Sequence, residues 1–267
     1  MTTLPSNHVT VPRRLITHEG ARSGTRIVPE ETAIAITFGR TTYAVMMATP
    51  ADIEDFAVGF SLTERIIEDV AEIIELEVVA IPLGIETRMT LSSNRDDQLL
   101  SRRRRHAGPA GCGLCGIESL EAAVAAPIPV ASSMRVSRDV IFRALGQLRE
   151  KQALNAKTHA AHAAGLWMGD DFLAVREDVG RHNALDKLAG ALARAKTAAS
   201  SGILVLSSRL SIELVQKASS IGCPIVVAVS APTAFALRAA EECGMTVVAV
   251  ARSDSLEVFT HAERIVE

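Results

Sequence analysis

The C-terminal quarter of the chain places the tightest limit on its fold. Three short and continuously apolar runs, ILVLS, PIVVAVS and TVVAVA, alternate there with two stretches of helical pattern, IELVQKASS and TAFALRAAEE. Continuous apolar runs are typical of strands covered on both faces, and alternating strands and helices indicate a parallel sheet. Upstream, AHAAGLWM and FLAVRE flank Gly169-Asp170, which favours a tight hairpin. We therefore expect an α/β fold with a mixed sheet, in which an antiparallel hairpin precedes a parallel βαβαβ part.

The patterns divide the chain into three regions. They are a mobile N-terminal arm without periodicity, a small α+β domain that includes an aperiodic segment at 94–116, and an α/β cofactor-binding domain, at residues 1–24, 25–130 and 131–267 respectively. In the α+β domain, Thr49 is expected to cap a helix that begins with Pro50.

Composition narrows the class of protein. The net charge is -3 and aromatic residues make up 3%, so a nucleic-acid partner is not expected. No apolar window of about 18 residues predicts a membrane span, and no apolar segment near the N-terminus predicts a secretory signal. The default expectation is a cytoplasmic protein, in which structural disulfides are rare. The isolated Cys223 and Cys243 are then expected to be small buried residues.

Polar residues follow each of the three C-terminal apolar runs. Because parallel strands bring these ends to one edge of the sheet, a ligand is expected there. Helix N-termini attract phosphate and arginine binds it in a bidentate way, so the ligand is expected to be anionic, a nucleotide or a phosphorylated cofactor. The alternative is that the hydroxyls only cap helices. No P-loop is present, and the GxGxxG spacing in GCGLCG (111–116) does not follow a predicted strand, as a dinucleotide-binding motif requires. The candidates at these ends are Ser207, Ser208, Arg209, Thr233, Arg252, Ser253 and Ser255.

A second polar stretch, VREDVGRHNALDK, lies at a predicted strand-to-helix junction. Arg181 and His182 open the helix, and His182 shares a helical face with Asp186. A solvated helix face explains spaced charges, but the junction leads into the same sheet edge. We therefore predict that Arg181 and His182 belong to the site.

The stretch HAGPAGCGLCGIE carries two cysteines, Cys112 and Cys115, among glycines and just after four arginines at 102–105. Nearby cations and a helix N-terminus lower the pKa of a thiol and favour the reactive thiolate. This pattern suits a thiol that carries sulfur as a persulfide.

A structural zinc site and a zinc deaminase are the alternatives to a carrier thiol. His159 and His162 would complete a zinc site with the two cysteines, but the gap is far longer than in zinc fingers. Zinc deaminases place an H-x-E motif before P-C-x-x-C, whereas the H-x-E motif at 261–263 comes after the cysteine pair. We therefore expect no metal site.

Five motifs together resemble the FdhD family of formate dehydrogenase accessory sulfurtransferases. The motifs are EDFAVGFSLTERII, GCGLCG, VREDVGRHNALDK, SSRLSIELVQKA and AVSAPTAFALRAAEECGMTVV, and the resemblance covers about residues 25–267. It implies a cytoplasmic homodimer with a small N-terminal domain and a three-layer C-terminal domain similar to cytidine deaminases. It also implies sulfur transfer from a cysteine desulfurase to the molybdenum bis(pyranopterin guanine dinucleotide) cofactor of formate dehydrogenase.

The resemblance also implies roles for particular residues. Cys112 and Cys115 would carry the sulfur, with Cys112 as the persulfide, and GDP would mimic part of the bound cofactor. The cofactor-binding loop would be Val250, Ala251, Arg252, Ser253, Asp254 and Ser255. This loop departs from the family pattern by adding the acidic Asp254 and Glu257, so binding is expected to rely more on Arg209, Arg181 and the Ser207–Ser208 hydroxyls. The alternatives are a cofactor chaperone without sulfur transfer and a zinc-stabilised structural protein.

Overall fold

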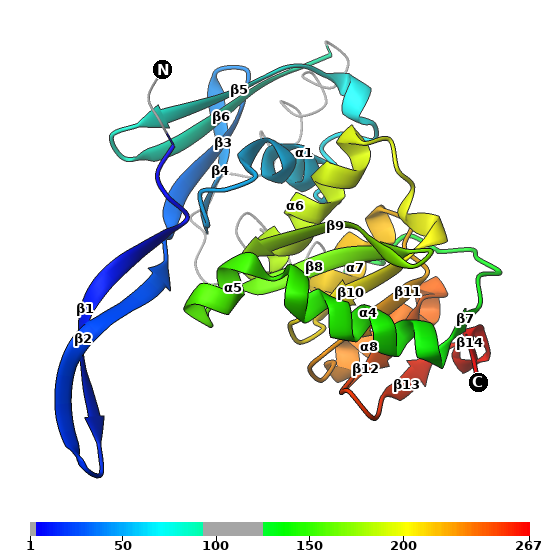
Figure 1. Cartoon of the computed structure of the whole chain (residues 1–267). Helices are drawn as coiled ribbons and strands as arrows, with labels where there is room; N and C mark the ends of the chain where they lie inside the picture. Colours follow the sequence, from blue (N-terminus) through cyan, green and yellow to red (C-terminus); the bar gives the residue numbers. More distant parts are fainter. Residues whose placement is uncertain (1–3, 93–124) are drawn as a thin grey trace.

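A six-stranded mixed sheet forms the centre of the computed structural model, which describes residues 4–92 and 125–267 (Figure 1). The strand order is β13-β12-β11-β10-β8-β9. β10, β11 and β12 are parallel, and β8, β9 and β13 are antiparallel to their neighbours. The predicted order of a hairpin followed by parallel strands is confirmed. The strands are β8 (His162–Met168), β9 (Asp171–Asp178), β10 (Ile203–Leu206), β11 (Ile225–Ala228), β12 (Thr246–Ala249) and β13 (Glu257–Thr260).

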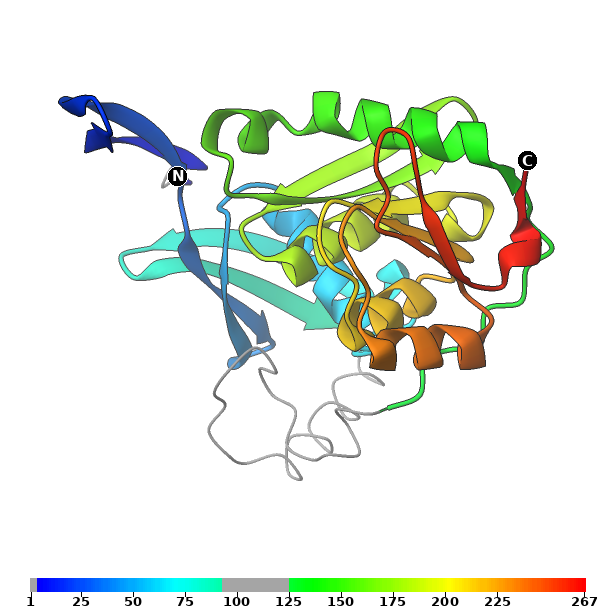
Figure 2. The ribbon, with the colours of Figure 1, turned by 90° about the horizontal axis from the view of Figure 1, so that it is seen from below.

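Helices cover both faces of this sheet and give three layers. Figure 2 shows α4 on one side of the sheet and α7 and α8 on the other. Every residue of β10, β11 and β12 is buried, because alternate side chains face the two helical layers. This burial explains their continuous apolar runs. The helices of this part are α4 (Arg138–Lys151), α5 (Ala153–Thr158), α6 (Arg181–Arg194), α7 (Ile212–Ser220) and α8 (Ala234–Cys243).

A smaller α+β unit lies before the central sheet in the chain. Its four-stranded sheet has the order β4-β3-β6-β5, and one face packs on α1 around Ile34, Phe56 and Met89. The elements are β3 (Thr32–Phe38), β4 (Thr41–Ala48), α1 (Ile53–Thr63), β5 (Ile73–Ile81) and β6 (Gly84–Leu91). Short elements complete the described chain: η1 (Val70–Glu72), β7 (Val136–Ser137), η2 (Ala199–Ser201), η3 (Ala262–Arg264) and β14 (Ile265–Val266).

The predicted start of α1 is wrong. The helix begins at Ile53 rather than Pro50, after Asp52 in the left-handed region. Thr49 does not cap it, because its hydroxyl accepts a hydrogen bond from the Val179 N–H (3.1 Å). A contact distant in sequence therefore takes the polar group that local pattern assigned to the helix.

The two units meet where α1 crosses α6. A Cβ atom on Gly59 would lie 1.7 Å from the Asp186 carbonyl oxygen, and one on Gly190 would lie 1.9 Å from that of Asp55. Only glycine at both positions lets the two backbones approach this closely. The crossing fixes the α+β unit against the helix that follows β9.

The N-terminal segment differs from the expected mobile arm at 1–24. β1 (His8–Thr17) and β2 (Gly20–Pro29) pair along their whole length as an antiparallel hairpin, which projects from the body of the molecule (Figure 1). Most of its side chains are exposed. Burial on one face is what creates apolar alternation in a strand, so an exposed hairpin leaves little periodicity to read.

Two further predictions lie outside the described residues. They are the aperiodic segment 94–116, which includes Cys112 and Cys115, and most of the helix expected directly after it. In the described ranges, no helix is both long and apolar enough to span a membrane.

Candidate functional site

The loops that follow β10, β11 and β12 lie together at one edge of the central sheet. Leu210 in the first loop bridges to Pro232 in the second. The Ala251 N–H donates to the Ala228 carbonyl at the end of β11 (3.3 Å). The edge also receives the start of β8, which runs antiparallel to β10, and the start of α6, because β9 pairs antiparallel with β8 and so runs in the same direction as β10. The predicted convergence of these strand ends is present in the fold.

The hydroxyl groups predicted for this edge serve the backbone. Ser207 Oγ accepts from the Ala163 N–H (2.8 Å), and Ser208 Oγ donates to the Arg209 carbonyl (3.0 Å). Thr233 Oγ1 accepts from the Ala236 N–H (3.2 Å) and caps α8. Of the three hydroxyls, only that of Thr233 caps a helix, and those of Ser207 and Ser208 bond to nearby backbone.

The loop 250–255 holds an unusual backbone conformation. Val250 has a φ of 51°, in the left-handed region that β-branched residues rarely adopt. The Arg252 guanidinium donates from Nη1 to the Val229 carbonyl (2.5 Å), and the Arg252 N–H donates to the Ser255 carbonyl (2.7 Å). Ala251 is buried, whereas 252–255 are exposed. Arg252 thus ties this loop to the end of β11.

The positive charge of the edge centres on Arg181 and Arg209, and His182 lies beside Arg181. Burial lowers the pKa of Arg181, and the charge of Arg209 lowers it further. Burial, followed by the charge of Arg181, lowers the pKa of His182 to about 4. Glu213, whose Oε2 lies 3.9 Å from His182 Nε2, is not among the residues predicted from the sequence. A glutamate in the first turn of a helix is favourable by itself, so nothing in the sequence marked it.

Several polar atoms of this cluster lack partners. Arg181 Nε, His182 Nε2 and Glu213 Oε2 are shielded from solvent, and no described residue forms a hydrogen bond with them. Buried polar groups are normally hydrogen-bonded, and exceptions are often filled by a water, an ion or a ligand. His162 lies at the same edge, where burial and the nearby charge of Arg181 lower its pKa.

Buried ion pairs hold the first turns of α6 in place. Lys187 Nζ lies 2.6 Å from Asp178 Oδ2, and both side chains are 0% exposed. Asp178 also accepts from the Gly180 N–H (2.7 Å) and from Asn183 Nδ2 (3.0 Å). This face of α6 is therefore buried rather than solvated. It fixes the position of Arg181 and His182.

The other residues considered from the sequence do not belong to the cluster of Arg181, His182 and Arg209. Cys223 and Cys243 are buried as expected, and burial raises the pKa of Cys223 to about 11. His159 ends α5 in the left-handed region. Within 4–92 and 125–267, no three His, Cys, Asp or Glu side chains are grouped to hold a metal ion.

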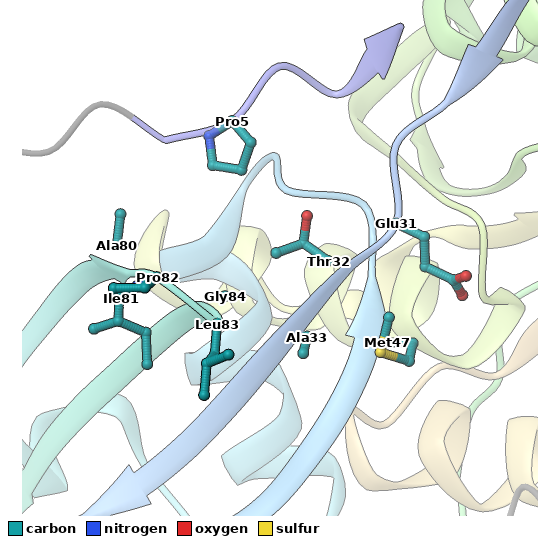
Figure 3. A pocket seen from close by; sticks show the side chains of 10 residues that line it. All are labelled: Pro5, Glu31, Thr32, Ala33, Met47, Ala80, Ile81, Pro82, Leu83 and Gly84. Atoms are coloured by element: carbon teal, nitrogen blue, oxygen red, sulfur yellow. The ribbon is translucent and has the colours of Figure 1, made fainter.

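A shallow groove of about 550 Å³ lies on the α+β unit, away from these residues (Figure 3). It contains none of the predicted site residues. Its lining is Pro5, Glu31, Thr32, Ala33, Met47, Ala80, Ile81, Pro82, Leu83 and Gly84.

Comparison with known proteins identifies the family. The model of the FdhD/NarQ family matches residues 29–266. A sulfur carrier protein FdhD of Agrobacterium fabrum is 50% identical over 91% of both chains, and one of Cupriavidus necator is 44% identical over 89% of this chain and 83% of its own. In fold, the chain is similar to a protein of Desulfotalea psychrophila described as a formate dehydrogenase accessory protein, with a TM-score of 0.77, 24% identity, and 97% and 99% of the two chains covered. The chain belongs to the FdhD/NarQ family.

Proposed function

We propose that this chain is a sulfur carrier protein that serves formate dehydrogenase. The main support is its identity of 41–50%, over most of the chain, to relatives named as sulfur carrier proteins. The proposed donor is a cysteine desulfurase and the proposed acceptor is the molybdenum bis(pyranopterin guanine dinucleotide) cofactor, bound as a substrate. We place this transfer in the cytoplasm and in a homodimer, as the family resemblance implies.

The carboxyl edge of the central sheet is the proposed binding site for a guanine dinucleotide end of that substrate. The observation that carries this proposal is the cluster of Arg181, His182 and Arg209, with shielded polar atoms that no described residue satisfies. Two arginine side chains within electrostatic range of each other favour a diphosphate. Arg252 and the rest of 250–255 would flank it, while Ser207, Ser208 and Thr233 would shape its loops.

Cys112 and Cys115 are the proposed carriers. The Cys112 thiolate would attack the outer sulfur of a desulfurase persulfide, form a new S–S bond and release the desulfurase cysteine as thiolate. Cys115 could then attack Cys112 Sγ and form a disulfide, so that the outer sulfur leaves with one proton as hydrosulfide. The two cysteines would supply both electrons for this reduction, which explains why the carrier needs two thiols rather than one.

Chain length allows the cysteines to serve this edge. Nine residues lie between Cys115 and Ala125, whose carbonyl accepts a hydrogen bond from Gln216 Nε2 (2.7 Å) on α7. Ten extended residues span up to roughly 33 Å, and the nine residues of α7 are about 13 Å long. The N-terminus of α7, where Glu213 lies, is therefore within the possible range of Cys115.

Persulfide labelling tests the carrier role. The protein is incubated with a cysteine desulfurase and cysteine, and its peptides are weighed. We expect one added sulfur atom on the peptide with Cys112, none in Cys112→Ala, and retained loading but impaired sulfide release in Cys115→Ala. In cells that lack the native factor, full formate dehydrogenase activity with both cysteines replaced would refute the carrier role and favour a cofactor chaperone.

A further inference from the structure

Two layers of charged side chains lie between α6 and α7, and they differ in how well they are paired. The inner layer is Asp186 with Lys217, four residues beyond His182 and Glu213 on their helices. Lys217 Nζ lies 2.9 Å from Asp186 Oδ1 and also donates to Thr63 Oγ1 (2.9 Å). In the outer layer, 3.9 Å separates His182 Nε2 from Glu213 Oε2. Neither of these atoms has a hydrogen-bond partner in the described part of the chain.

The surroundings of His182 explain why the outer pair stays open. Burial is the largest cause of the lowered His182 pKa, followed by Arg181 beside it, and Lys217 acts in the same direction. Glu213 and Glu64 oppose this shift but do not reverse it. At neutral pH the imidazole is therefore uncharged. Glu213 then faces Arg181 as its counter-charge, which raises the pKa of that guanidinium against the effect of burial.

A bound anion at this edge would interact with the two arginines and with Glu213. Its negative charge offsets Arg181 and Arg209, so the repulsion that keeps His182 neutral falls. The same negative charge lies close to the Glu213 carboxylate and is repelled by it. A proton on His182 relieves this repulsion, because the imidazolium can form an ion pair with Glu213 across the present gap.

We propose that the carboxyl edge binds its nucleotide anion together with one proton, which His182 takes from solvent and holds against Glu213. Glu213 is thereby a residue that determines how strongly the site prefers its anion at a given pH. The proposal rests on the nucleotide site of the proposed function, but it concerns proton linkage and can fail while that site stands.

Linkage fixes the sign of the effect. Without the anion, His182 has a pKa of about 4 and is uncharged at neutral pH, and a bound anion is expected to raise that pKa. Proton uptake, and the gain in affinity, therefore occur between the two pKa values as pH falls from neutral. In that window the affinity changes by up to about tenfold per pH unit.

Calorimetry with GDP as the probe counts the protons. GDP is titrated at pH 5.5 in two buffers of different ionisation enthalpy, for wild type and for His182→Gln, which keeps a donor but cannot become charged. Subtraction removes the titration of GDP itself. We expect that, on binding GDP, wild type takes up as much as one proton more than His182→Gln. His261→Gln is the matched control, because His261 lies 3.6 Å from a Glu263 oxygen but remote from this edge, and it is expected to behave as wild type.

Glu213→Gln gives an independent measurement. Without the carboxylate, proton uptake should fall and GDP binding at pH 7.5 should tighten, on the order of fivefold. Equal proton counts in wild type and His182→Gln would overturn the proton linkage while leaving the nucleotide site in place. Absence of GDP binding in every variant would instead overturn the nucleotide site, and the linkage with it.

Discussion

Lys187→Met removes one partner of the buried pair that anchors α6. Lys187 Nζ lies 2.6 Å from Asp178 Oδ2 and donates to the Thr49 carbonyl (2.9 Å), with no exposure of either charged side chain. Methionine has a similar volume, so the change mainly removes the charge and its hydrogen bonds. Asp178 is left as a buried anion between the two units of the fold.

The expected cost follows from this burial. Breaking a buried ion pair by removing one partner typically costs about 3–5 kcal/mol. Asp178 keeps donors from the backbone N–H groups of Thr49 (2.9 Å) and Gly180 (2.7 Å) and from Asn183. These donors partly compensate the charge, so we expect a loss of about 3 kcal/mol in the free energy of unfolding. For a chain of this size the loss lowers Tm by roughly 6–12 °C.

Urea unfolding and calorimetry at neutral pH measure the loss. The matched control is the double variant Asp178→Asn with Lys187→Met, which removes the uncompensated charge. We expect it to recover part of the lost stability, because the buried charge is gone and the asparagine oxygen can still accept from the Gly180 N–H and Asn183 Nδ2, while its amide nitrogen faces the Thr49 N–H. A loss below about 1 kcal/mol in Lys187→Met, or no recovery in the double variant, would refute the role assigned to the pair.

Three further predictions concern the site and the core. Arg209→Ala should weaken GDP binding about tenfold to a hundredfold, and Arg252→Ala less, because that guanidinium already bonds a loop carbonyl; equal losses in calorimetry would contradict this. Gly190→Ala should lower the free energy of unfolding despite the better helix propensity of alanine, since its Cβ would lie 1.9 Å from the Asp55 carbonyl oxygen. Cys223, buried and with a pKa raised to about 11, should resist alkylation until the protein unfolds, and rapid labelling of the native protein would disprove this.

The layered architecture, and the sheet edge at which the candidate residues gather, could be predicted from the sequence. The apolar runs 203–206, 225–228 and 246–249 are buried on both faces, and such burial leaves a signal in each strand alone. Alternation of strands and helices then places their carboxyl ends at one edge. That rule needs only the order of elements along the chain, so Arg181 and Arg209 could be predicted as site residues from the sequence.

Tertiary structure decided which polar groups remain available at that edge. Thr49 and Val179 are distant in sequence, yet the Thr49 hydroxyl accepts from the Val179 N–H rather than capping α1. Glu213 belongs to the site only because α7 lies beside α6, which places it opposite His182. The pattern of neighbouring residues indicates on which face of a helix or strand a residue lies. The partner of a buried charge is set by which elements pack together, and this is known only once the chain has folded.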